Sequence, residues 1–146
     1  MACDRCGTPV NLIEPLSTGQ FDLAIGSRLR SASQIQRGLK REWISRAYNW
    51  LVKALFQTQF SDAQCGFKAI TRSAALALLP RVEDSGWFFD TELLLIAEKL
   101  GYRILDLPVH WVDDPDSRVK IFRTAYRDLK GLLRVRRNLF LHRYSR

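Results

Sequence analysis

Apolar residues along the chain alternate between a strand-like and a helix-like pattern. Residues 21–26 form a short apolar run that ends at a glycine, which is typical of a buried strand. The segment 27–34 is polar and has no period, so we expect a loop there. From Ile35 onward, apolar residues recur every three or four positions as far as Phe56, which predicts a long helix over 35–56.

The rest of the chain continues this alternation and predicts an α/β layer architecture. We expect a short helix within 9–16, a strand at 67–71, a helix over 74–79 that Ser73 caps and Pro80 stops, a helix from Asp90 to Leu100, a strand at 102–112, a turn at 113–117 and a helix over 117–138. Gly101 suits the end of a helix, and Pro108 indicates an edge or a bulge in the last strand.

Composition describes one globular domain with a positive charge. The chain has 146 residues, of which 47% are hydrophobic, and a net charge of +8. Such a charge indicates an anionic partner, such as nucleic acid, an anionic lipid or a phosphorylated ligand. Three cysteines without a signal peptide suggest a reducing compartment. No apolar run is long enough to predict a transmembrane segment.

Cations are concentrated near the end of the chain. Asp128 is the only acid between 118 and 146, and apolar residues there form one helical stripe flanked by Lys and Arg. We expect 117–146 to be a basic amphipathic helix and tail that lies on an anionic membrane surface. The alternative is a helix packed on the domain with a solvated basic face. Nucleic acid is not expected as a partner, because no nucleic-acid motif accompanies the charge.

Several side chains are candidates for binding or catalysis. Arg28 follows the 21–26 strand, where open α/β sheets bind ligands, and a guanidinium group there can hold phosphate. Asp90 and Glu92 follow an aromatic run, so each is either part of a site or an acid in the first turn of a helix. Cys3 and Cys6 make only half of a zinc site, and we predict no metal site.

A series of motifs resembles a known family. They are Asp-Leu-Ala-Ile-Gly-Ser-Arg at 22–28, Ser-Arg-Ala-Tyr-Asn at 45–49, Asp-Ala-Gln-Cys-Gly-Phe-Lys at 62–68, Trp-Phe-Phe-Asp-Thr-Glu-Leu at 87–93, Pro-Val-His-Trp at 108–111 and Asp-Ser-Arg-Val-Lys at 116–120. In this order they resemble the family 2 glycosyltransferases that use polyprenyl-phosphate acceptors, of the dolichyl-phosphate β-glucosyltransferase type.

The resemblance implies both a fold and an activity. Residues 9–116 would be the C-terminal half of a GT-A domain, which contains a Rossmann-like sheet, after an irregular N-terminus at 1–8. The family transfers a sugar from a nucleotide-sugar to a polyprenyl phosphate such as dolichyl or undecaprenyl phosphate, with Mg²⁺ or Mn²⁺. A phosphate acceptor is already an anionic nucleophile, so a strong general base is less necessary. The location implied is peripheral, on the cytoplasmic face of a membrane.

The resemblance also implies roles for single residues by their place in the motifs. Asp90 would lie near the reacting centre as the catalytic residue. The residues expected to bind the acceptor or donor phosphate are Arg28, Arg46, Arg118 and Lys120. The residues expected to shape the sugar pocket are Asp62, Gly66 and Phe67.

The chain departs from the family pattern at its N-terminus. Cys3-Asp4-Arg5 stands where the family has the Asp-x-Asp pair that holds the metal, and an arginine cannot coordinate a cation. We therefore expect the family's metal ligands to be absent and this truncated chain to be inactive alone, with weak or no nucleotide-sugar binding. The alternative function is a non-enzymatic, basic peripheral membrane or phospholipid-binding module.

Overall fold

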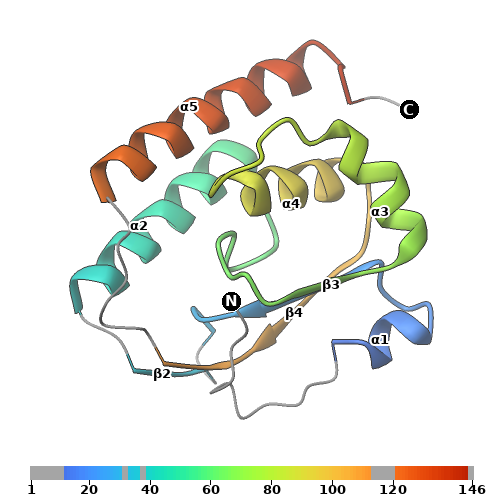
Figure 1. Cartoon of the computed structure of the whole chain (residues 1–146), viewed down its shortest axis with the longest axis horizontal. Coiled ribbons are helices and arrows are strands. Elements are labelled where there is room, and N and C mark those ends of the chain that lie inside the picture. The colour runs from blue at the N-terminus through green and yellow to red at the C-terminus, as the bar shows by residue number, and fades with distance from the viewer. Residues whose placement is uncertain (1–11, 31–32, 37–38, 113–120, 145–146) are drawn as a thin grey trace.

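The computed structural model describes residues 12–30, 33–36, 39–112 and 121–144, and it confirms the α/β class. Its strands lie together along one side of the molecule, and helices α2, α4 and α5 lie on the other (Figure 1). The expected turn at 113–117 and residues 9–11 of the helix expected within 9–16 lie outside the described residues. Within 9–16 only the start of a helix is seen, because α1 spans Glu14–Ser17.

A three-stranded mixed sheet has β1 (Leu23–Ser27) at its centre, and β1 confirms the strand predicted at 21–26. β3 (Lys68–Ile70) pairs antiparallel with β1, and β4 (Ile104–Pro108) pairs parallel with it. Every residue of β1 is buried, as is usual for an apolar strand that is covered on both faces. Because β1 is the central strand, its carboxyl end lies between β3 and β4.

A second sheet changes two of the predicted boundaries. β2 (Gln34–Gln36) pairs parallel with β5 (His110–Val112), so the single strand predicted at 102–112 is divided after Pro108. Pro108 ends β4 because it has no N–H to continue a ladder. The prediction that a helix begins at Ile35 was wrong. Ile35 pairs with β5, and α2 spans Leu39–Phe56, because one apolar residue fits either period.

The residues predicted to end or begin two helices had different outcomes. α3 spans Arg72–Leu78, and Thr71 rather than Ser73 is its N-cap, since Thr71 Oγ1 accepts from the backbone N–H of Ala74 at 3.3 Å. Pro80 lies in the short 3₁₀ helix η1 (Leu79–Arg81) that follows. Gly101, after α4 (Phe89–Lys99), has φ of +80°, which confirms it as a left-handed helix end.

The core forms between α4 and its neighbours. Thr91 to Ala97 of α4 are buried, and α5 (Ile121–Phe140) packs on α4 through Leu132 and Val135. Gly131 permits this approach, because a Cβ there would lie 2.5 Å from the Phe88 ring. The helix predicted over 117–138 is thus partly packed on the domain. Among the described residues, each helix is too short or too polar to traverse a bilayer.

Candidate functional site

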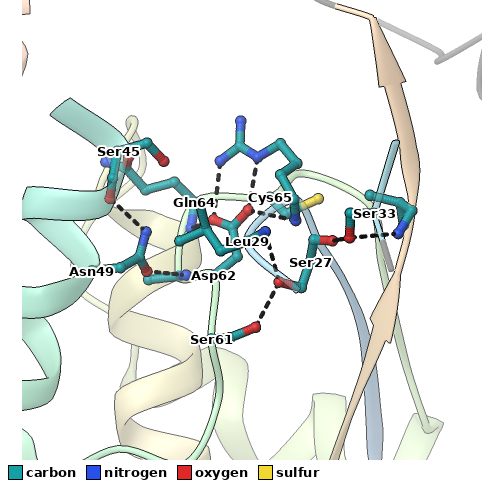
Figure 2. A network of polar contacts seen from close by, with 12 residues as sticks. Ser27, Leu29, Ser33, Ser45, Asn49, Ser61, Asp62, Gln64 and Cys65 are labelled. Carbon is teal, nitrogen blue, oxygen red and sulfur yellow. Dashed lines mark hydrogen bonds and ion pairs between the residues drawn. The ribbon is translucent and has the colours of Figure 1, made fainter. Parts of the chain in front are cut away.

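A polar network surrounds the carboxyl end of β1 and the loop 57–67 (Figure 2). Ser27 Oγ and Ser61 Oγ lie 2.6 Å apart, and the backbone N–H of Leu29 donates to Ser27 Oγ at 3.1 Å. Ser61 also donates to Asp106 Oδ2 of β4, from its backbone N–H at 2.7 Å and from its hydroxyl at 2.6 Å. Strand ends that are far apart in sequence are thereby held at one place.

Arg28 and Asp62 form a bidentate ion pair inside this network. Arg28 Nε and Nη2 donate to the two carboxylate oxygens of Asp62 at 2.7 and 3.0 Å, and the Arg28 backbone N–H donates to the same group at 3.1 Å. Asp62 is buried. Burial alone would raise the pKa of Asp62, but the hydrogen bonds and charge of Arg28 outweigh it and lower the pKa. Asp62 therefore stays ionised and fixes the orientation of Arg28.

Lys68 and Asp90 form a second ion pair beside the first. Lys68 Nζ lies 3.3 Å from Asp90 Oδ1, and it also donates to the backbone carbonyl of Cys65. The Lys68 side chain is largely buried. Burial lowers the pKa of Lys68, and the charge of Asp90 opposes that effect. The Asp90 carboxylate is about one third exposed and accessible to a ligand.

Glu92 serves a different purpose from Asp90, two residues earlier. It is buried, and it accepts from Arg134 Nη2 of α5 at 2.7 Å and from the backbone N–H of Asp84 at 2.8 Å. Burial raises its pKa, while these hydrogen bonds and the charge of Arg134 act in the opposite direction. Glu92 therefore fastens α5 to α4 and lies outside the cluster formed by Arg28, Asp62, Lys68 and Asp90, which we call the strand-end cluster.

The other predicted site residues lie outside the strand-end cluster or outside the described residues. Gly66 is exposed on the loop, and Phe67 is half-buried next to Gly26, whose N–H donates to the Phe67 carbonyl at 2.8 Å. Arg46 lies on the exposed side of α2 and pairs with Glu42 of the same helix. The structure shows no contact that joins Arg46 to the described cluster. Arg118 and Lys120 lie outside the described residues.

Two side chains that the sequence did not single out hold the loop 57–67 from opposite sides. Asn49 of α2 accepts from the backbone N–H of Ala63 at 2.8 Å. Gln64 Nε2 donates to Asp128 of α5 at 2.8 Å, and its backbone N–H donates to Asp62 at 3.1 Å. Burial raises the pKa of Asp128 to about 6. Asn49 ends the quoted 45–49 motif, and Asp128 is the only acid between 118 and 146, and these were the signals that the sequence offered for them.

The strand-end cluster is not suited to a divalent cation. Its two carboxylates, Asp62 and Asp90, are each paired with a cationic side chain, which would repel a metal ion. Within the described ranges, no group of three His, Cys, Asp or Glu side chains is placed to hold a metal. Cys65 is buried, and burial raises the pKa of its thiol. Cys3 and Cys6 lie outside the described residues.

The chain is similar to several glycosyltransferases. It shares 42% identity over 112 residues with glycosyltransferase AglD of Haloferax volcanii, which is 77% of this chain and 18% of AglD. It is 28% identical over 137 residues to the dolichyl-phosphate beta-glucosyltransferase of Saccharomyces cerevisiae, or 87% of this chain and 41% of the yeast protein. The Mus musculus enzyme of that name is 34% identical over 119 residues, 80% of this chain and 37% of that protein.

These similarities cover most of this chain but less than half of each relative. No family model matches the chain, and no solved structure matches it. The matched relatives include AglD and several proteins with the same dolichyl-phosphate beta-glucosyltransferase name. The chain is therefore homologous to AglD and to the dolichyl-phosphate β-glucosyltransferases over a portion of those proteins.

Proposed function

We propose that the chain is part of a glycosyltransferase that transfers a sugar from a nucleotide-sugar to a polyprenyl phosphate at a membrane surface. The observation that carries the proposal is the strand-end cluster, in a chain homologous to dolichyl-phosphate β-glucosyltransferases. The cluster lies at the carboxyl end of β1, where open α/β sheets place ligands. The rest of a GT-A domain would supply the donor site.

The chemistry required of these residues is mainly positioning and charge neutralisation. A lipid phosphate carries its own negative charge and needs no strong base to attack the anomeric carbon of the donor sugar, whose bond to the nucleoside diphosphate breaks as the diphosphate leaves. Lys68 supplies positive charge in a partly desolvated place, where such charge acts strongly on an anion. Asp90 is exposed enough to orient the acceptor or sugar, and Arg28 is held in one geometry by Asp62. Arg118 and Lys120 would complete the phosphate contacts.

Binding to lipid phosphate tests this proposal on the chain itself. Phosphatidylcholine vesicles containing dolichyl phosphate would be compared in flotation with vesicles containing dolichol and enough phosphatidylserine to match the charge. We expect stronger binding to dolichyl phosphate, reduced about tenfold by Lys68→Met, which removes one charge contact of roughly 1.4 kcal/mol. The matched control is Lys99→Met, an exposed lysine of α4. Equal binding to the two vesicle types, or an unchanged Lys68→Met variant, would contradict the proposal.

The isolated chain should not complete the reaction. Arg5 occupies the place where the family has a metal-binding acid, and the cluster carboxylates are engaged by cations. Radiolabelled nucleotide-sugar incubated with dolichyl phosphate and the purified chain should therefore yield no glycolipid. A measurable product would overturn this expectation.

The second candidate function is a non-enzymatic peripheral membrane module. It is favoured by the exposed apolar side chains and cations of α5, which fit a phospholipid surface without any acceptor. Protection of the chain from proteolysis distinguishes the two. Greater protection on vesicles with dolichyl phosphate than on charge-matched phosphatidylserine vesicles supports the enzyme. Equal protection on the two vesicle types supports the module.

A further inference from the structure

One side of α5 exposes large apolar residues to solvent. Tyr126, Leu129, Leu133 and Phe140 are exposed, Phe140 to 82%. Their spacing of three, four and seven residues puts them on a single stripe of the helix. The opposite side holds Asp128, Leu132 and Val135, which are buried in the domain. Packing therefore accounts for only one face of this amphipathic helix.

α2 has a second exposed stripe of the same kind. Trp43 and Trp50, seven residues apart, are 73% and 71% exposed, and the small exposed residues Ala47 and Ala54 lie on the same side. The buried side of α2 contains Asn49, Val52 and Phe56. A soluble surface rarely exposes two tryptophans on one helix without a partner.

The two stripes face the same side of the molecule. Figure 1 shows α2 and α5 running side by side in the same direction, and Arg136 Nη1 of α5 donates to the Leu55 carbonyl of α2 at 3.2 Å. Arg136 follows Leu129 and Leu133 at helical spacing, so the apolar stripe of α5 borders the side that meets α2. On α2, Ile44 and Leu51 lie between the tryptophans and this junction.

Cations border this apolar face along both outer sides. Arg46 and Lys53 lie beyond the tryptophans on α2, and Arg127, Lys130 and Arg137 lie on the far side of α5, all exposed. Glu42, which pairs with Arg46, is the sole acid in the α2 sequence, and Asp128, which is buried, is the sole acid of α5. An apolar centre with a cationic border matches the boundary between acyl chains and anionic headgroups.

We propose that the exposed faces of α2 and α5 together form one docking surface for an anionic bilayer, with Trp43 and Trp50 inserted at the headgroup boundary. Tryptophan is favoured there because its ring is apolar and its N–H is polar. The inference refines the membrane partner of the proposed function and extends it from α5 to α2. It does not require sugar transfer or polyprenyl phosphate.

The docking surface is connected to the strand-end cluster through the loop 57–67. Both docking helices hold the loop 57–67 with residues from their buried sides, α2 through Asn49 and α5 through Asp128. That loop carries Asp62, the partner of Arg28. Each docking helix is thus joined by one hydrogen bond to the loop that contains Asp62 of the strand-end cluster. Docking fixes the height of the cluster relative to the headgroups of the membrane.

Vesicles without polyprenyl phosphate test the docking surface separately from the enzyme. The chain would be floated with phosphatidylcholine vesicles that contain or lack phosphatidylserine, and tryptophan emission would be quenched with brominated lipid. We expect binding that needs phosphatidylserine, falls with added salt, and decreases at least about tenfold in the double variant Trp43→Ser, Trp50→Ser. Most of the quenching should disappear in that variant.

Trp87 provides the matched control. It is 66% exposed but lies before α4, outside both docking helices. Trp87→Ser should keep wild-type vesicle binding and quenching, and circular dichroism should show that all variants fold. Vesicle binding that is unaffected by the double variant would overturn the proposal. So would self-association through Trp43 and Trp50 in place of binding to lipid, measured by sedimentation.

Discussion

The Arg28–Asp62 pair joins residues that stand 34 positions apart in the chain. The sequence suggested both as ligand contacts, Arg28 from its place after a strand and Asp62 from a motif. No pattern of apolar and polar residues reports that two distant side chains will pair with each other. A buried acid with a lowered pKa is the consequence, and its cost of burial is offset only while the arginine is present.

Replacing Asp62 by Asn should destabilise the chain by about 3 kcal/mol at neutral pH, since it leaves Arg28 without its buried counter-charge. This difference in stability should become smaller in acid. The lowered pKa of Asp62 stabilises the folded chain at pH values above the ordinary pKa of an aspartate, and this stabilisation is lost as pH falls through the pKa of Asp62 in the folded state. Urea unfolding at several pH values measures both effects. The control is Asp22→Asn, which breaks the more exposed pair with Arg103 and should cost less than about 1 kcal/mol.

Asp128 should show the opposite dependence on pH. Its folded pKa of about 6 lies above the ordinary pKa of an aspartate, so its contribution to stability is present below that ordinary pKa and is lost as pH rises through about 6. Asp128→Asn keeps an oxygen that can accept from Gln64 and removes the buried charge. The variant should be more stable than wild type above pH 6, by about 1 kcal/mol or more, and equal to it in strong acid. A variant less stable than wild type above pH 6 would refute this interpretation.

At the scale of elements, α5 is held by charge as well as by packing. Arg134 Nη2 lies 2.7 Å from Glu92 Oε2, and Arg134 Nε lies 3.6 Å from Glu83 Oε2. Gly131 allows the helix to approach Phe88. The sequence predicted the helix and its basic face. It did not reveal the buried polar contacts, because Glu92 in the first turn of α4 is equally explained by the helix dipole.

Arg134 is only partly buried, but Arg134→Ala should destabilise the packing of α5 markedly. It leaves Glu92 buried without its ion pair, which should cost about 2–3 kcal/mol and reduce amide protection along α5 in hydrogen exchange. Arg137→Ala, which removes an exposed arginine one turn later, should leave protection unchanged. Equal effects of the two substitutions would show that Glu92 does not depend on Arg134.

At the scale of the whole molecule, the sequence anticipated the α/β class, the central strand β1 and the helices α2 to α5, because each has a clear apolar period. It did not anticipate the second sheet, since three-residue strands such as β2 carry too few positions to show a period. The site was anticipated in part. Arg28, Asp62 and Asp90 were predicted as site residues, whereas Lys68 only ended a quoted motif and was given no role. The pairings of these residues arise from the fold, which brings β1, β3 and α4 together.

The central claim is that a lipid phosphate lies at the strand-end cluster while α2 and α5 rest on the bilayer. The most direct measurement is photocrosslinking in vesicles with a polyprenyl phosphate analogue whose reactive group is next to the phosphate, followed by mass spectrometry of the labelled peptides. Labelling should fall on the loop 57–67, Lys68 and the start of α4 at Asp90, and unmodified dolichyl phosphate should compete with it. Labelling confined to other parts of the chain, such as α3, would contradict the claim.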